Sequence, residues 1–258
     1  MKYASGTKIS STKATMETLG LKAASAQLSN IIDTAEKMQL SYREFMDKIL
    51  LAELAARNEK HRRRNYAAAH FPPAVKTLDE FNTAELESGI TPTQLIQLKD
   101  LAWVDACTNI FFLGPPGLGK TMLALGLGLE AINQGYTVCF ERMVNLIEIL
   151  DTAKNSRTSA FRLRKIRKCS VIIIDEIGFV PISKAQANAF FSFVSDVYEH
   201  ASLIFTTNKQ VGEWAEILGD PVLATALLDR LLYNAKCFSL KGESFRIKHP
   251  MDNGQSQD

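Results

Sequence analysis

Apolar residues in the first third of the chain recur at spacings of three and four, which is typical of helices. Between residues 21 and 64 these positions are Leu28, Ile31, Ile32 and Ala35, followed by Phe45, Ile49 and Ala52. Ser41 and Glu44 have the spacing of a capping box, so we expect the second helix to begin there. Residues 1–20 are rich in Ser, Thr and Lys without a period, and we expect them to be weakly ordered.

From residue 109 onward, short β-rich runs alternate with helical patterns. The runs are 109–113, 136–140, 170–174, 202–206 and 236–240. Strands that are apolar on both faces and separated by helices predict a parallel sheet covered on both sides, so the fold class is α/β. Phe71-Pro72-Pro73 breaks the preceding helix. We therefore expect a helical N-terminal module at 1–70, an α/β domain at 71–252 and a polar tail at 253–258.

Composition narrows the class of protein without identifying it. The chain has 258 residues, of which 46% are hydrophobic and 22% are charged, with a net charge of +2. These values are typical of a globular protein. The four cysteines lie too far apart for the short spacing of a zinc site or a redox motif. The first residues contain no apolar signal block and no long apolar run follows, so we expect a cytoplasmic protein without a membrane span.

A glycine-rich segment follows the first predicted strand and precedes a helical pattern. It reads Gly114, Pro115, Pro116, Gly117, Leu118, Gly119, Lys120 and Thr121, and Met122 comes next. Glycines let such a loop curl so that consecutive N–H groups point at phosphate oxygens, and the next helix presents its positive end to them. Lys120 is expected to reach the β- and γ-phosphates of ATP and Thr121 to bind Mg²⁺.

Two further predicted strands end in polar residues. Asp175 and Glu176 follow four apolar residues, which places them at the carboxyl edge of the sheet, where α/β proteins bind ligands. Asp175 suits the Mg²⁺ site and Glu176 suits a base that polarises water, which favours hydrolysis over phosphate transfer. Asn208 follows the next strand and could bond the water or the γ-phosphate, although an Asn after a strand is often only a turn residue.

A basic cluster is hidden in a chain that is almost neutral overall. Residues 152–170 contain no acid but hold Lys154, Arg157, Arg162, Arg164, Lys165, Arg167 and Lys168. Such a local charge attracts phosphates without reading base sequence, so we expect a contact with duplex DNA. A second candidate is the run Arg62, Arg63 and Arg64. The alternative for both is an ordinary solvated helix face.

Several segments together resemble the IstB-like transposition helper ATPases, which belong with the DnaC helicase loaders in the AAA+ class. The resemblance rests on the segments 112–121, 174–183, Thr207-Asn208-Lys209, 212–214, Asp220-Pro221, 228–231 and 242–246, and it covers about residues 40–248. It implies a P-loop ATPase core of AAA+ type with a five-stranded parallel sheet. The chain has Met122 where relatives often have His, and Glu176 where many have Asp.

The resemblance implies roles for three more residues. Asn208 resembles the sensor residue of the fourth core strand, and Arg230 resembles an arginine finger that reaches into the ATP site of a neighbouring subunit. Arg246 resembles the second sensor, which touches the γ-phosphate within its own subunit. A finger acting between subunits implies a head-to-tail homo-oligomer, either a ring or a helical filament. Each arginine could instead be an ordinary surface or ion-paired side chain.

Four functions fit these observations to different degrees. The leading one is a transposition helper that assembles on DNA with ATP and recruits or stimulates a cognate transposase, with hydrolysis controlling disassembly. A replicative helicase loader shares the whole ATPase core, and only the N-terminal module, which is expected to contact partners, DNA or other subunits, argues against it. A small-molecule P-loop kinase would need an acceptor pocket and a mobile lid. A DNA-binding module that uses ATP only as a switch also stays open.

Overall fold

The computed structural model describes residues 9–178 and 181–248. Contacts divide the chain into two compact units, Met1–Arg64 and Asn65–Asp258. The division falls inside helix α3, Tyr42–Ala69. The domain limits 1–70 and 71–252 stay a prediction, and the tail at 253–258 lies outside the described residues.

The first unit is helical, as the apolar spacing predicts. It contains α1, Ile9–Thr18, α2, Lys22–Met38, and most of α3. The expectation of a weakly ordered start is wrong for residues 9–18, because Met16 is buried against Ala24 and Leu28 of α2. Met16 is the buried residue of α1, and a single apolar position shows no helical spacing in the sequence. The hydrophobic pattern therefore could not predict this helix. The Ser41 cap is confirmed: the Ser41 N–H donates to Glu44 Oε2 at 2.8 Å.

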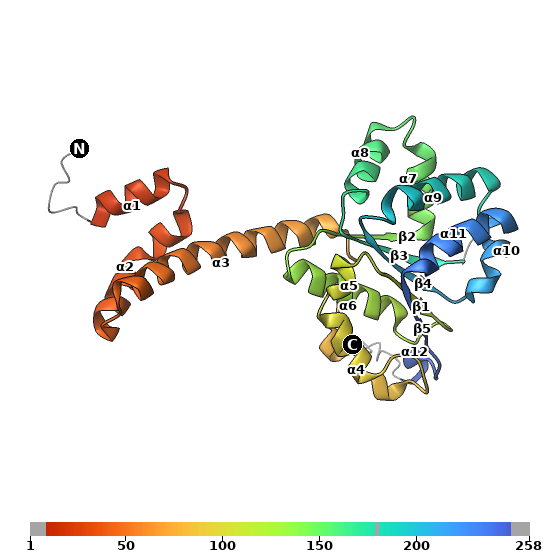
Figure 1. Cartoon of the computed structure of the whole chain (residues 1–258), viewed down its shortest axis with the longest axis horizontal. Helices are drawn as coiled ribbons and strands as arrows, with labels where there is room; N and C mark the ends of the chain where they lie inside the picture. The colour runs from red at the N-terminus through yellow and green to blue at the C-terminus, as the bar shows by residue number, and fades with distance from the viewer. Residues whose placement is uncertain (1–8, 179–180, 249–258) are drawn as a thin grey trace, which may run out of the picture. The chain divides into compact units, whose positions relative to one another are not determined.

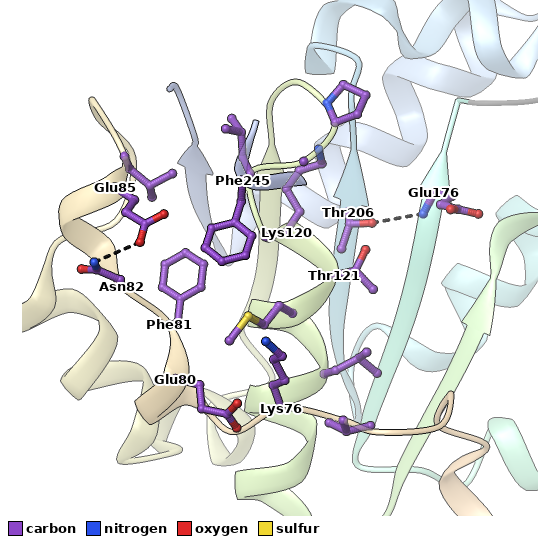
Figure 2. A pocket seen from close by; sticks show the side chains of 18 of the residues that line it. Lys76, Glu80, Phe81, Asn82, Glu85, Lys120, Thr121, Glu176, Thr206 and Phe245 are labelled. Atoms are coloured by element: carbon purple, nitrogen blue, oxygen red, sulfur yellow. Dashed lines mark hydrogen bonds between the residues drawn. The ribbon is translucent and has the colours of Figure 1, made fainter. Parts of the chain in front are cut away.

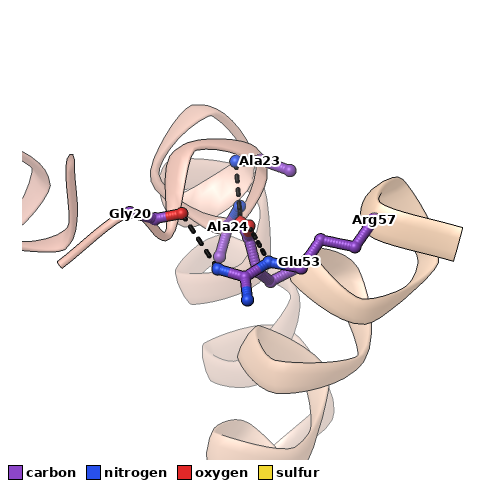
Figure 3. Close-up of polar contacts among 5 residues, drawn as sticks. All are labelled: Gly20, Ala23, Ala24, Glu53 and Arg57. Atoms are coloured by element: carbon purple, nitrogen blue, oxygen red, sulfur yellow. Dashed lines mark hydrogen bonds and ion pairs between the residues drawn. The ribbon is translucent and has the colours of Figure 1, made fainter. Parts of the chain in front are cut away.

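A buried carboxylate joins α2 to α3 in this unit (Figure 3). Glu53 of α3 is only 7% exposed. Its Oε2 accepts hydrogen bonds from the N–H groups of Ala23 and Ala24, which begin α2, at 2.9 and 3.1 Å. Arg57 donates to Glu53 Oε1 and to the carbonyl of Gly20. The hydrogen bonds that Glu53 accepts lower its pKa, and the bond from the Ala24 N–H has the largest effect. The carboxylate also supplies an acceptor for the free N–H groups at the start of α2.

The second unit is built on five parallel strands in the order β2-β3-β4-β1-β5 (Figure 1). The strands are β1, Asn109–Leu113, β2, Val138–Arg142, β3, Val171–Ile177, β4, Ser202–Thr207, and β5, Ala235–Ser239. The predicted parallel sheet is confirmed, with strand ends shifted by up to three residues. β1 pairs with β4 and β5, so its carboxyl end opens beside those of both neighbours.

Alternate residues of each central strand enter two separate cores. Phe111 of β1 belongs to one core and Phe112 to the other. In β3, Ile172 and Ile173 divide in the same way. A sheet covered on both faces has no solvated face, which explains why its strands read as continuous apolar runs.

Helices cover both faces of the sheet (Figure 1). One core contains residues of α7, Met143–Thr152, α8, Arg157–Ile166, α9, Lys184–Val197, α10, Trp214–Leu218, and α11, Pro221–Tyr233. The opposite core contains residues of α4, Pro92–Lys99, α5, Ala102–Asp105, and α6, Lys120–Asn133. Short elements complete the unit: η1, Leu78–Glu80, η2, Thr83–Glu85, η3, Val211–Glu213, and α12, Phe245–Lys248. No helix within 9–178 and 181–248 is long and apolar enough to cross a bilayer.

Candidate nucleotide-binding site

The loop between β1 and α6 depends on three glycines with positive φ. Gly114, Gly117 and Gly119 have φ of 138°, 85° and 82°. A Cβ on Gly114 would lie 2.3 Å from the carbonyl oxygen of Leu240, and one on Gly117 would lie 2.0 Å from Ser244 Oγ. Residues other than glycine rarely adopt this backbone conformation, and a Cβ at Gly114 or Gly117 would collide with the C-terminal segment. The loop therefore exposes its backbone, as a phosphate cradle requires.

Lys120 begins α6 directly after the loop. Its Nζ donates to the carbonyl oxygens of Gly114 and Pro115, both at 2.6 Å. The ammonium group therefore lies over the loop, at the N-terminal end of a helix of 14 residues. Loop N–H groups, a helix N-terminus and a cation together fit the triphosphate of ATP.

Asp175 joins the first turn of α6 to two strands. Its Oδ1 accepts a hydrogen bond from Thr121 Oγ1 at 2.8 Å and another from Thr206 Oγ1. The residue is only 3% exposed, so the carboxylate is buried but bonded. The described ranges hold no group of three or more His, Cys, Asp or Glu side chains that could hold a metal ion. A hydroxyl and a carboxylate suit Mg²⁺, which takes its other ligands from phosphates and water.

Glu176 occupies an irregular position that the sequence did not indicate. Its register with β4 shifts between Ile174 and Ile177, and its φ is 63°. The Glu176 N–H donates to Thr206 Oγ1 at 3.1 Å, and Arg142 Nε lies 3.6 Å from Glu176 Oε2. In a regular strand, the side chains of consecutive residues point to opposite faces of the sheet. The bulge changes this alternation, so Asp175 and Glu176 can both lie at the carboxyl edge of the sheet. Left-handed backbone costs free energy in a non-glycine residue, so the surrounding contacts must hold Glu176 in place.

Asn208 follows β4, which lies between β3 and β1. Its Oδ1 is buried without a hydrogen-bond partner among the described residues. A buried acceptor of this kind usually has a partner, so its position suits a ligand or an ordered water. Asn208 does not line the cavity described next.

A cavity of about 480 Å³ lies beside the loop (Figure 2). Residues 116–122 line it together with Glu176, Thr206 and Thr207. Val75, Phe81, Leu86 and Phe245 form another wall, and only Phe245 lies in a segment that carries the family resemblance. The rings of Phe81 and Phe245 lie in the same part of the cavity. Apolar and aromatic walls next to a phosphate cradle fit a nucleotide base.

The C-terminal segment is bonded to the glycine-rich loop. The Phe245 N–H donates to the carbonyl oxygen of Gly117 at 2.9 Å. Lys241 forms an antiparallel bridge with Ser88. This bridge joins the C-terminal segment to the part of the chain that contains the cavity-lining residue Leu86. The side chain of Arg246, the expected second sensor, lies outside the described part of the structure.

Arg230 does not line the cavity of its own chain. It lies on α11, where its guanidinium donates to Ser195 Oγ of α9. The guanidinium carbon also lies 4.7 Å from the centroid of the Phe191 ring and 5.9 Å from that of Tyr198. Lys120, Thr121 and Glu176 therefore line one cavity with Asp175 bonded to Thr121, whereas Arg230 does not line that cavity.

The basic cluster divides into paired and unpaired side chains. Arg162 is only 14% exposed as a side chain and donates to Glu141 Oε1 at 2.7 Å. It cannot serve as the exposed DNA contact that its charge predicted, because tertiary structure supplies a buried acid. Arg167 forms an ion pair with Asp196, with 2.9 Å between Nη2 and Oδ2. In the first unit, Arg62 and Arg63 both donate to Glu59.

The ion pairs of Arg62 and Arg63 also affect the pKa of Glu59. Arg62 and Arg63, through their hydrogen bonds, lower the pKa of Glu59 to about 2. Arg64 instead lies near His61, 3.5 Å from Nη2 to Nδ1. The spacing of three and four along α3 allows these pairs. Exposed pairs are weak, and the Arg63 side chain is 77% exposed, so the pairs do not remove the run from contact with a partner.

Changing Gly114 to alanine is expected to weaken nucleotide binding strongly and to destabilise the second unit. The added Cβ meets the backbone of Leu240, which has no rotamer that removes the clash. Gly135→Ala is the matched control, because its φ is 95° and nothing lies within 4 Å of an added Cβ. The control should lose only the backbone term of about 1–2 kcal/mol. Thermal melting and titration with a fluorescent ATP analogue measure both effects, and equal losses in the two variants would contradict the clash.

Comparison with known proteins identifies the family. A family model described as IstB-like ATP binding protein matches residues 14–253. A relative from Pseudomonas aeruginosa, named for ATP binding in insertion sequence IS21, is 37% identical over 230 residues, which cover 89% of this chain and 86% of the relative. A relative from Geobacillus stearothermophilus, named likewise for insertion sequence IS5376, is 38% identical over 85% of this chain and 87% of its own length.

Solved structures support the fold. The crystal structure of DnaI gives a TM-score of 0.56 at 18% identity, covering 67% of this chain and 95% of that chain. The structure of DnaA from Aquifex aeolicus bound to AMPPCP gives a TM-score of 0.55 at 17% identity, covering 69% of this chain and 54% of that chain. These neighbours are AAA+ P-loop proteins, and the fold class expected from the sequence is confirmed. The chain belongs to the IstB-like ATP-binding proteins of IS21-type insertion sequences.

Proposed function

We propose that this protein is an ATP hydrolase that assembles on DNA as a helper of transposition. The observation that carries the proposal is the cluster around Asp175, which bonds Thr121 and Thr206 while Glu176 lines the adjoining cavity. An acid at the edge of the cavity suits activation of water. A second cavity of about 320 Å³, which Glu176 also lines, is where the acceptor of a small-molecule kinase would have to bind.

Each group in the site has one task in this proposal. The loop N–H groups and Lys120 bind the phosphates of ATP, and Thr121 with Asp175 would hold Mg²⁺, which neutralises charge on the phosphates. Glu176 accepts a proton from water and orients it. Asn208, whose Oδ1 is buried without a partner among the described residues, would be a further contact if the water or phosphate reaches it. Arg246 would touch the γ-phosphate as the family resemblance implies. The aromatic wall at Phe81 and Phe245 receives the base.

The active site is complete only between two chains in this proposal. Arg230 lies outside its own cavity on α11, so it would supply positive charge to the phosphates held by a neighbouring subunit. Contacts of this head-to-tail kind build a ring or a helical filament. ATP binding then promotes assembly, and hydrolysis promotes release.

The assembled protein would bind duplex DNA through its basic residues and act with a transposase. Arg157, Arg164, Lys165 and Lys168 are exposed, and none has an acidic partner within the described ranges. The transposase is proposed because the relatives carry the names of insertion sequences. The N-terminal unit, with Arg62, Arg63 and Arg64, is proposed to contact partners or neighbouring subunits. Pull-down with the cognate transposase and with the replicative helicase separates the two partners.

The test of the DNA role is a paired charge change. Arg164→Gln with Lys168→Gln should lower the affinity for duplex DNA and reduce the slope of log K against log salt by about two, because each phosphate contact contributes about 0.9. DNA-stimulated phosphate release should fall with it. Lys37→Gln with Lys236→Gln removes the same charge elsewhere and should leave both values unchanged. Equal behaviour of the two double variants would reject this DNA site.

A further inference from the structure

The exposed side of α8 carries one aromatic ring among its cations. Arg157, Phe161, Arg164 and Lys165 recur at spacings of three and four, so they share one face of the helix. Lys168 follows in the turn that ends the helix, where its N–H donates to the carbonyl of Lys165 at 3.1 Å. We call these five residues the α8 basic face.

Three residues on the other side of α8 pack into the protein interior or pair with an acid. Leu163 and Ile166 are buried in the core, and Arg162 is held by Glu141 and by Cys139 Sγ, which it approaches at 3.2 Å. These contacts fix the rotation of α8 about its axis. The α8 basic face is therefore turned outward by packing on the opposite side, not by chance orientation of long side chains.

Phe161 is unusual on such a surface. Phe161 is 55% exposed, and Lys165 Nζ lies 4.6 Å from the centroid of its ring. The ring stands one helical turn from Arg157 and from Arg164. A partner that binds these cations lies beside the ring, so a partner with both negative charge and a flat apolar surface fits this face.

A nucleic acid strand has that combination of chemistry. Its phosphates are anionic, and every base has a π-face that stacks on aromatic side chains. The span from Arg157 to Lys168 is about 16 Å at the rise of a helix, which matches about five nucleotides of a stacked strand. In a regular duplex the base faces are covered by their neighbours, so only unstacked bases can meet the Phe161 ring.

We propose that Phe161 stacks on an unstacked base of the DNA whose phosphates bind the surrounding cations, so that the protein prefers locally distorted DNA to regular duplex. The inference rests on the proposed DNA contact of α8 and adds to it a reading of DNA distortion. Cations alone recognise phosphates and cannot make this distinction. Phe161 supplies it because a ring gains contact only where stacking between base pairs is already broken or easily broken.

The test compares two DNA duplexes of the same length and charge in fluorescence anisotropy titrations. One is fully paired, and the other has a short central run of mismatched pairs. The full chain with ATP should bind the mismatched duplex more tightly. Phe161→Ala should lose about tenfold in affinity for the mismatched duplex, because stacking on one base contributes roughly that factor. It should change the affinity for the paired duplex little, and Phe161→Trp should restore the preference.

Controls distinguish the possible failures. Ile96→Ala removes another exposed apolar side chain, 63% exposed on α4, and should have no effect on either duplex. If Phe161→Ala keeps the full preference while Arg164→Gln with Lys168→Gln weakens binding, the stacking inference is wrong and the DNA site stands. If neither change alters DNA binding, α8 has another partner, such as an acidic protein, and both proposals fail.

Discussion

Arg230→Ala is expected to reduce ATP turnover by about a thousandfold or more while nucleotide binding persists. The reason is that a guanidinium placed against the transferring phosphoryl group stabilises charge that develops only in the transition state. The cavity of the chain does not include Arg230, so the loss should not extend to the affinity for ATP. Steady-state phosphate release and titration with a fluorescent ATP analogue measure the two quantities separately.

Mixing two inactive variants tests whether Arg230 acts between chains. Lys120→Ala lacks the phosphate-binding cation but keeps Arg230, so it can complete the site of an Arg230→Ala neighbour. Random assembly of equal amounts would regain about a quarter of the wild-type sites, because one of four neighbour combinations is intact. Recovery of no activity, together with wild-type turnover that does not depend on protein concentration, would contradict the shared site.

A structural role of Arg230 needs its own control. The guanidinium bonds Ser195 and lies over Phe191, so its removal also disturbs the packing of α9 and α11. Ser195→Ala removes the hydrogen-bond partner but keeps the guanidinium, and it should retain most of the turnover. Comparable loss in both variants, with a lowered melting temperature, would assign Arg230 to folding instead.

Glu176→Gln is expected to lower hydrolysis by about a hundredfold to ten-thousandfold, the usual contribution of a positioned general base. The amide keeps the size of the side chain but cannot accept the proton of water. ATP should still bind, because the loop, Lys120 and the Thr121–Asp175 bond are unchanged. The variant should therefore stay assembled on DNA with ATP, which sedimentation or electron microscopy can follow.

The matched control for this change is Glu216→Gln. Glu216 is an exposed acid on α10 and lines neither the nucleotide cavity nor the second cavity beside Glu176. This change removes the same charge, so the variant should hydrolyse ATP at the wild-type rate. If Glu176→Gln also turns over normally, water is activated by another group and the base assigned here is wrong.

Much of the nucleotide site could be predicted from local patterns. A glycine-rich loop between a strand and a helix, and acids after a buried strand, follow from short segments whose chemistry needs no distant partner. The carboxyl ends of parallel strands meet at one edge, so the proximity of Thr121, Asp175 and Thr206 is a consequence of the sheet. The aromatic wall at Phe81 and Phe245 had no such signal, because those residues are far apart in the chain and join only through the fold.

The amino-acid sequence by itself determined the α/β class, the parallel sheet and the phosphate-binding loop, since periodicity and glycine positions act over a few residues. Only the tertiary structure decided which charges are available. It buried Arg162 against Glu141 and paired Arg167 with Asp196, acids that lie elsewhere in the sequence. It also turned Phe161 outward among the remaining cations. The physical reason is that packing of the apolar side of α8 fixes the direction of every other side chain on the helix.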